Sequence, residues 1–162
     1  MTRFADTDRL DRVTLHEENP PSRSPEAQQD LDVALYDLGE TNRFRLTAED
    51  APQGPYALAL GMTGRLLMLR IESASGETIQ EMHLSLSTLR PCLKDYAAIC
   101  ESYVGAVSAT TRAQIETIDM ARRAIHDEGS TLLMERLEDR IATDFDTARR
   151  LFTVVAALQV RG

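Results

Sequence analysis

The chain has 162 residues, 43% of them hydrophobic and 27% charged, which fits one globular domain and argues against extensive disorder or a fibrous repeat. Its formal net charge is −8 and no basic run occurs. Nucleic-acid binding draws most of its affinity from neutralised phosphates, so we expect no nucleic-acid partner. The longest apolar-rich run, Leu151–Leu158, is too short to cross a bilayer, so no membrane span is expected.

The N-terminal sequence MTRFADTDRLDRV has neither the basic start nor the apolar core of a secretory signal. We therefore expect a cytoplasmic protein. Residues 1–11 show no periodicity and are predicted to be flexible, whereas residues 12–162 are expected to form a single domain. The sequence RVTLH at 12–16 alternates between polar and apolar residues and predicts a short edge strand.

The first helix is predicted by its capping signals. Ser24 can cap it, Pro25 suits the first helical position, and Glu26 places an acid in the first turn. The apolar stripe that follows predicts a helix to about Leu38, with Gly39 placed to end it. The sequence NRFRL after it is expected to be briefly extended.

From Tyr56 the apolar period changes to two. Alternating apolar residues over 56–62, 67–71 and 82–86 predict three strands, with turns at Thr63-Gly64 and Ser75-Gly76. Short turns of this kind join antiparallel neighbours. We therefore predict an antiparallel β-meander.

The rest of the chain is predicted to be helical, with helices that start near residues 87, 111, 130 and 143. Gly129 is expected to interrupt the helical pattern, and Ser130 to cap the next helix. The last helix is apolar on nearly all sides, which is typical of a central core helix or of one shared across a dimer interface. The fold class is thus α+β, a three-stranded antiparallel meander packed with about five helices. The C-terminal four would form a helical subdomain around the apolar last helix.

Self-association is expected from two features. Leu66 and Met68 make the second strand partly apolar on its outer side, so that face needs a covering helix or a partner subunit. Together with the apolar last helix, this predicts a homodimer. The two cysteines, Cys92 and Cys100, lie about 12 Å apart along one expected helix at ~1.5 Å per residue, too far to bridge, and are expected to be buried thiols.

The segment Asp119–Arg150 holds the densest set of polar side chains. Its members are Arg122, Arg123, His126, Asp127, Glu128, Ser130, Arg136, Arg140, Asp144, Asp146, Arg149 and Arg150. At 100° per residue, Arg122 and His126 border an apolar helix face, as does Arg149 on the last helix. The expected helix start at Gly129-Ser130 would offer free backbone N–H groups to an anion. Ligand-binding candidates are therefore Arg122, Ser130 and Arg149, with His126 as the catalytic candidate.

The same charges also fit a structural network that needs no ligand. The expected pairs are Asp119 with Arg123, and Arg122 or Arg149 with Asp144, Asp146 or Glu128. The three histidines, His16, His83 and His126, never have the spacing of a metal-ligand pair, and no phosphate loop or dinucleotide fingerprint occurs. No metal and no cofactor are predicted.

A family resemblance extends over most of residues 12–158. Its segments are ENPP, FRL, GPYALALGM, LRPCLKDYAAICESY, QIETIDMARRAIHDEGSTLLMERLEDRI and DFDTARRLFTVVAAL. They resemble an uncharacterised protein family of alphaproteobacteria, number 262 of the UPF series. Residues 1–11 and the loop Thr47–Gln53 lie outside the resemblance. Membership implies a bacterial cytoplasmic protein and transfers no catalytic residue.

Two functional hypotheses follow. The preferred one is a non-catalytic binding or regulatory module that self-associates and holds an anionic small molecule. The alternative is an enzyme acting on a small phosphate- or carboxylate-bearing molecule, with a polar site around Gly129-Ser130. In that enzyme His126 would be the acid/base, and Arg122 and Arg149 would clamp the anion.

Overall fold

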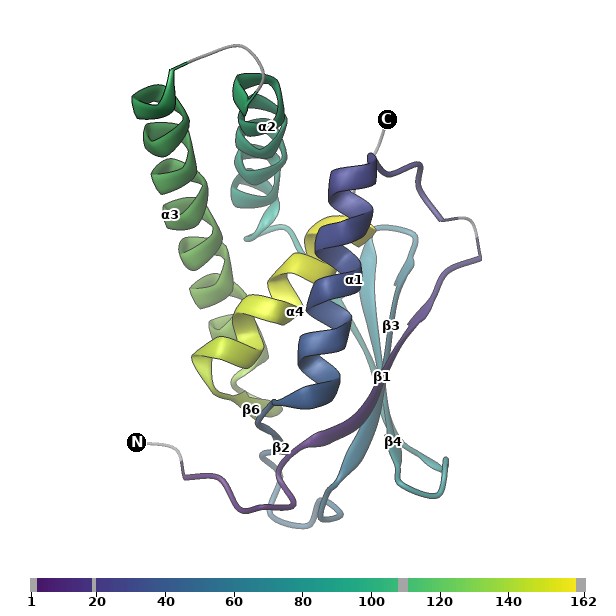
Figure 1. Ribbon diagram of the computed structural model, residues 1–162. Coiled ribbons are helices and arrows are strands. Elements are labelled where there is room, and N and C mark those ends of the chain that lie inside the picture. The colour runs from purple at the N-terminus through teal and green to yellow at the C-terminus, as the bar shows by residue number, and fades with distance from the viewer. Residues whose placement is uncertain (1–2, 19, 108–110, 160–162) are drawn as a thin grey trace.

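The computed structural model describes residues 3–18, 20–107 and 111–159 (Figure 1). Within these residues the fold is α+β, with four helices, one four-stranded sheet and one two-stranded sheet. Helices α1 and α4 lie side by side against the large sheet, and helices α2 and α3 form an antiparallel pair beside them (Figure 1). None of the described helices combines the length and the apolar character needed to cross a membrane.

The large sheet has the strand order β1-β3-β4-β5. Strands β3 (Tyr56–Thr63), β4 (Leu66–Ser73) and β5 (Thr78–Ser85) form the antiparallel meander that the alternating pattern predicts. Strand β1 (Leu10–His16) adds a fourth strand at the edge, parallel to β3. The sheet is therefore mixed, and the prediction of a purely antiparallel three-stranded sheet is wrong. Parallel neighbours need a long crossover, which here contains α1 (Pro25–Glu40).

A two-stranded antiparallel sheet joins two distant parts of the chain. Strand β2 (Phe44–Leu46) is the extended piece expected after the first helix, and it pairs with β6 (Ile141–Thr143), so that Phe44 lies opposite Thr143. This pairing fixes the C-terminal end of α1 near the start of α4 (Phe145–Leu158). It therefore helps to bring together α1 and α4, which both carry polar side chains.

The C-terminal half contains three helices where the sequence predicts four. Helix α2 spans Arg90–Val107, and α3 runs without a break from Arg112 to Leu137. Gly129 lies inside α3, at the point where α4 crosses it. A Cβ on Gly129 would come 2.2 Å from Cε1 of Phe152. Glycine in a helix interior costs only about 1 kcal/mol relative to alanine, and here it admits an aromatic ring onto the helix backbone. The predicted helix break is wrong.

The core lies between the large sheet and the helices that cover it, α1 and α4. Eight of the 14 residues of α4 are buried, which confirms a central core helix. Packing within one chain is therefore enough to explain why the helix is apolar on nearly all sides. The helix packs against α1 as well as α3, so the C-terminal helices do not form the separate subdomain that the sequence predicts. Of the two thiols, Cys92 is buried and Cys100 is half-buried, and both are free.

Asn42 ties the start of β1 to the end of α1. Its side-chain oxygen accepts a hydrogen bond from the Leu10 N–H at 2.6 Å, and its amide nitrogen donates to the carbonyls of Leu10 at 2.9 Å and Leu38 at 2.6 Å. Both Leu10 and Asn42 are buried. The ordered strand therefore begins before residue 12, the predicted boundary.

A second tie links the segment after β1 to the C-terminus of α4. Arg23 forms an ion pair with Glu17 at 2.6 Å and donates to the carbonyl of Ala157 at 3.1 Å. The Arg23 side chain is only 7% exposed. A cation beside the last carbonyls of a helix also interacts favourably with the helix dipole.

Candidate functional site

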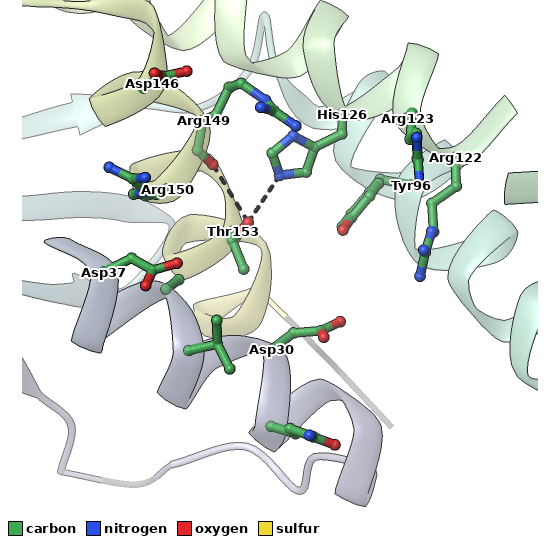
Figure 2. A pocket seen from close by; sticks show the side chains of 13 residues that line it. Asp30, Asp37, Tyr96, Arg122, Arg123, His126, Asp146, Arg149, Arg150 and Thr153 are labelled. Carbon is green, nitrogen blue, oxygen red and sulfur yellow. Dashed lines mark hydrogen bonds between the residues drawn. The ribbon is translucent and has the colours of Figure 1, made fainter. Parts of the chain in front are cut away.

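A cleft of about 570 Å³ opens between α1, α3 and α4, with one residue of α2 at its side (Figure 2). Its lining residues are Gln29, Asp30, Val33, Ala34, Asp37, Tyr96, Arg122, Arg123, His126, Asp146, Arg149, Arg150 and Thr153. Side chains three, four or seven positions apart share a face of a helix, and each helix presents one such strip to the cleft. The cleft is thus lined mainly by charged side chains.

Three of the four residues predicted from the sequence line this cleft. Arg122 and His126 come from α3, and Arg149 comes from α4. Ser130 does not reach the cleft. It is fully buried, and its hydroxyl donates to the His126 carbonyl at 2.7 Å. Because α3 continues through Gly129, the amides there belong to the helix interior, and the anion site predicted at Gly129-Ser130 is absent from the structure.

His126 is held in one orientation by its neighbours. Its Nε2 lies 2.8 Å from the Thr153 hydroxyl oxygen, and that hydroxyl lies 3.3 Å from the Arg149 carbonyl (Figure 2). The Thr153 hydroxyl can donate to this carbonyl or to Nε2, so the geometry fits a neutral imidazole protonated at either ring nitrogen. The ring also makes edge contacts with Tyr96 and Phe152, at centroid distances of 5.3 and 5.1 Å.

The surroundings of His126 keep it neutral. Burial, with the positive charges of Arg149 and Arg122, lowers the pKa of His126 from 6.5 to about 4, against an opposing effect of Asp127. Burial is the largest cause, because the imidazolium loses its hydration. At neutral pH this side chain is an uncharged hydrogen-bonding group.

The basic side chains of α3 have partners at the rim. Asp119 pairs with Arg122 at 2.6 Å and with Arg123 at 3.1 Å, and the second of these pairs is the one predicted from the sequence. The Arg122 guanidinium also lies 4.1 Å from the centre of the Tyr103 ring. The α3 cations are therefore oriented before any ligand arrives.

On α4, Arg149 pairs with Asp127 at 3.2 Å. The partners predicted for Arg122 and Arg149, which were Asp144, Asp146 and Glu128, form no ion pair within the described ranges, so that part of the network prediction is wrong. Asp144 instead caps α4, where its carboxylate accepts the Thr147 N–H at 3.0 Å.

Comparison with known proteins identifies the same family as the sequence resemblance. The family described as "Uncharacterised protein family (UPF0262)" matches residues 7–161. The chain belongs to this family. Named UPF0262 proteins include one from Paracoccus denitrificans, which is 49% identical over 153 residues (93% of this chain, 94% of the relative). Another, from Azorhizobium caulinodans, is 45% identical over 163 residues and covers 100% of both chains. No solved structure matches.

The UPF0262 match confirms the resemblance and extends it beyond residues 12–158 at both ends. A relative from Ruegeria sp. (strain TM1040) is 46% identical over 157 residues, covering 95% of this chain and 99% of its own. All the described helices and strands, and the residues that line the cleft, lie within the UPF0262 match.

Sequence reasoning missed the two acids that α1 brings to the cleft. Asp30 and Asp37 lie far in sequence from the 119–150 segment, which already included the third acid of the cleft, Asp146 in the first turn of α4. Burial raises the pKa of Asp30, while Arg122 acts in the opposite direction and Glu26 adds to the rise. The spacing of Asp30 and Asp37 shows that they share a helix face, but the segment that this face meets is a matter of tertiary packing.

The chemistry that this cleft offers is charge recognition. Four guanidinium groups, from Arg122, Arg123, Arg149 and Arg150, border it, and guanidinium matches the geometry of carboxylate and phosphate. Among the described residues, no group of three or more His, Cys, Asp or Glu side chains is placed to hold a metal ion.

Proposed function

We propose that this UPF0262 protein is a non-catalytic module that binds a small molecule bearing a phosphate or carboxylate group in the α1–α3–α4 cleft. The observation that supports the proposal is that four arginine side chains line a cleft of about 570 Å³. Pockets of roughly 300–1,000 Å³ suit small ligands.

The ion pairs around the cleft leave room for an anion. The Arg149 and Asp127 side chains are 44% and 54% exposed. Exposed pairs of this kind contribute only about 0–1 kcal/mol, so an anion can replace Asp127 at little cost. The Asp119 pairs hold Arg122 and Arg123 near their binding positions, which reduces the entropy lost when a ligand binds.

The state of His126 favours binding over the alternative of an enzyme. General acid–base catalysis works best when the pKa lies near the working pH, whereas burial and neighbouring cations lower the pKa of His126 to about 4. Its Nε2 is hydrogen-bonded to the Thr153 hydroxyl, and the buried Ser130 hydroxyl donates to a carbonyl. A neutral, hydrogen-bonded histidine is suited to support the cleft wall.

The test is titration calorimetry at low ionic strength with inorganic phosphate, pyrophosphate and succinate as probes. We expect at least one probe to bind. Arg149→Gln should weaken that binding about tenfold, the usual effect of losing a charge-assisted hydrogen bond. Arg112→Gln is the matched control, because Arg112 is exposed at the start of α3 and lies outside the cleft lining. Equal affinities for both variants and the wild type would refute the proposal, and so would a failure of the cleft to bind either these anions or a carboxylate-bearing peptide.

We also propose self-association, through the C-terminal helices or the outer face of the sheet. Val107 and Met120, on α2 and α3, are 55% and 71% exposed, and Leu66 on β4 is 40% exposed. Equilibrium sedimentation tests this proposal. A mass that stays near 18.1 kDa at high concentration would contradict it.

A further inference from the structure

The two sides of the cleft carry opposite charge. Helix α1 contributes Asp30 and Asp37 and no basic side chain, whereas α3 contributes Arg122 and Arg123 and no acidic one. In Figure 2 the labelled acids of α1 lie on one side of the opening and the labelled basic residues of α3 on the other. A ligand in the cleft therefore meets both signs of charge.

The acids of the cleft differ from its arginines in how they are paired. Within residues 3–18, 20–107 and 111–159, Asp30, Asp37 and Asp146 form no ion pair within 4.0 Å and accept no side-chain hydrogen bond. Each of the four arginines has a partner, and that of Arg150 is the Thr41 carbonyl at 3.0 Å. The carboxylates thus face the cleft with their hydrogen-bonding capacity unused by the protein.

The spacing of these acids indicates the kind of group they would receive. Asp30 and Asp37 are seven residues apart, about 10 Å along α1 at ~1.5 Å per residue, too far to share one small metal ion. Between them α1 presents Val33 and Ala34 to the cleft. An ammonium group with its three donors can bind at either carboxylate, while a short carbon chain rests on the apolar surface between.

We infer that the cleft takes a zwitterionic small molecule of the amino-acid or short-peptide type, with its carboxylate toward the arginines of α3 and α4 and its ammonium toward Asp30 or Asp37 of α1. This inference rests on the proposed anion-binding function and adds a cationic requirement to it. The arginine side by itself accounts for anion binding, and the acidic side would repel a simple anion. The ammonium group of a zwitterion is attracted to the acids of α1, whereas a simple anion is repelled by them. The acidic side of the cleft would therefore select zwitterions over simple anions.

The probes are glycine, diglycine, triglycine and tetraglycine, because each added residue extends the distance between the two charges by up to about 3.5 Å. Each peptide is compared with its N-acetyl form, which lacks the cation, and its C-terminal amide, which lacks the anion. Calorimetry at low ionic strength should show that at least one zwitterion binds about tenfold more tightly than either blocked form, since each end makes a charge-assisted hydrogen bond.

The decisive variant is the double change Asp30→Asn and Asp37→Asn. It should remove the preference for the free amine while the N-acetyl peptide binds as well as before or better. Asp32→Asn is the matched control, because Asp32 is exposed on α1 and lies outside the cleft lining. Circular dichroism and urea unfolding of each variant would verify that the fold is retained.

Two results would overturn the inference, and they differ in what they imply for the proposed function. If N-acetyl peptides, phosphate or succinate bind as tightly as every zwitterion, or if no glycyl peptide binds while a simple anion does, the cleft is an anion site and only the zwitterion inference fails. If no peptide and no simple anion binds, both proposals fail.

Discussion

Lowering the pH from 7 to 5 should destabilise this protein through His126. In the unfolded chain this imidazole takes up a proton near pH 6.5, whereas in the folded state burial and the charges of Arg149 and Arg122 lower its pKa to about 4. Between these values the unfolded state binds more protons than the folded state. Stability must therefore fall as the pH falls through this window, and the full loss is reached below about pH 4.

The size of the effect follows from the two pKa values. A folded pKa of about 4 and an unfolded pKa of 6.5 give a loss of about 2 kcal/mol for this one group between pH 7 and pH 5. Native domains are stable by only about 5–15 kcal/mol, so a change of this size shifts a urea midpoint measurably.

The assay is urea unfolding of the wild type and of His126→Gln at pH 7 and pH 5. Glutamine keeps an amide that can hydrogen-bond to Thr153 and does not titrate. Its smaller volume will lower stability at both pH values, so only the change between them is compared. The wild type should lose about 2 kcal/mol more than the variant. Equal losses would refute the lowered pKa, and proton NMR of the imidazole would give the folded value directly.

Three further predictions concern packing and buried contacts, all measured as urea unfolding free energies. Gly129→Ala should cost about 2–3 kcal/mol because the new methyl group meets an aromatic ring, whereas Gly105→Ala, with open space around it, should stabilise α2 by up to about 1 kcal/mol. Equal effects of the two would argue against the close helix crossing. Asn42→Ala should cost about 2–3 kcal/mol, since it leaves buried backbone groups without partners, and a loss below the error of the measurement would show that water replaces the side chain. Arg23→Leu should cost about 3 kcal/mol and Glu17→Gln should recover part of it, because the second change removes the unpaired charge. No recovery in the double variant would mean that the contact of Arg23 with the end of α4 dominates.

The parts of the fold that the sequence predicts correctly depend on local signals. Alternating apolar residues indicate β3, β4 and β5, and their short turns set the antiparallel order. The Ser24 cap occurs as predicted at the start of α1, and α3 begins near the predicted residue 111, where Thr111 and Gln114 form a capping box. Each of these features involves residues that are close in sequence, so the pattern itself carries the information.

The parts that could not be predicted depend on distant contacts. The segment 12–16 shows that a strand forms there, but its partner β3 lies across a long crossover and no turn identifies it. The same limit applies to the cleft. Helical periodicity places Arg122 and His126 on one strip, whereas Asp30 enters the site only because α1 packs beside α4. Local spacing shows which side chains share a face, and the tertiary fold determines what that face meets.

Gly129 has a different role in the structure from the helix break that the sequence predicts. A helix break there would have made an anion site at Ser130. In the structure the absent side chain lets the Phe152 ring lie against α3, and that crossing places Thr153 within 2.8 Å of His126. The same approach brings α3 close to α4, so that Arg149 reaches Asp127 on α3. The glycine therefore acts on the cleft through packing, because it sets how closely the two arginine-bearing helices meet.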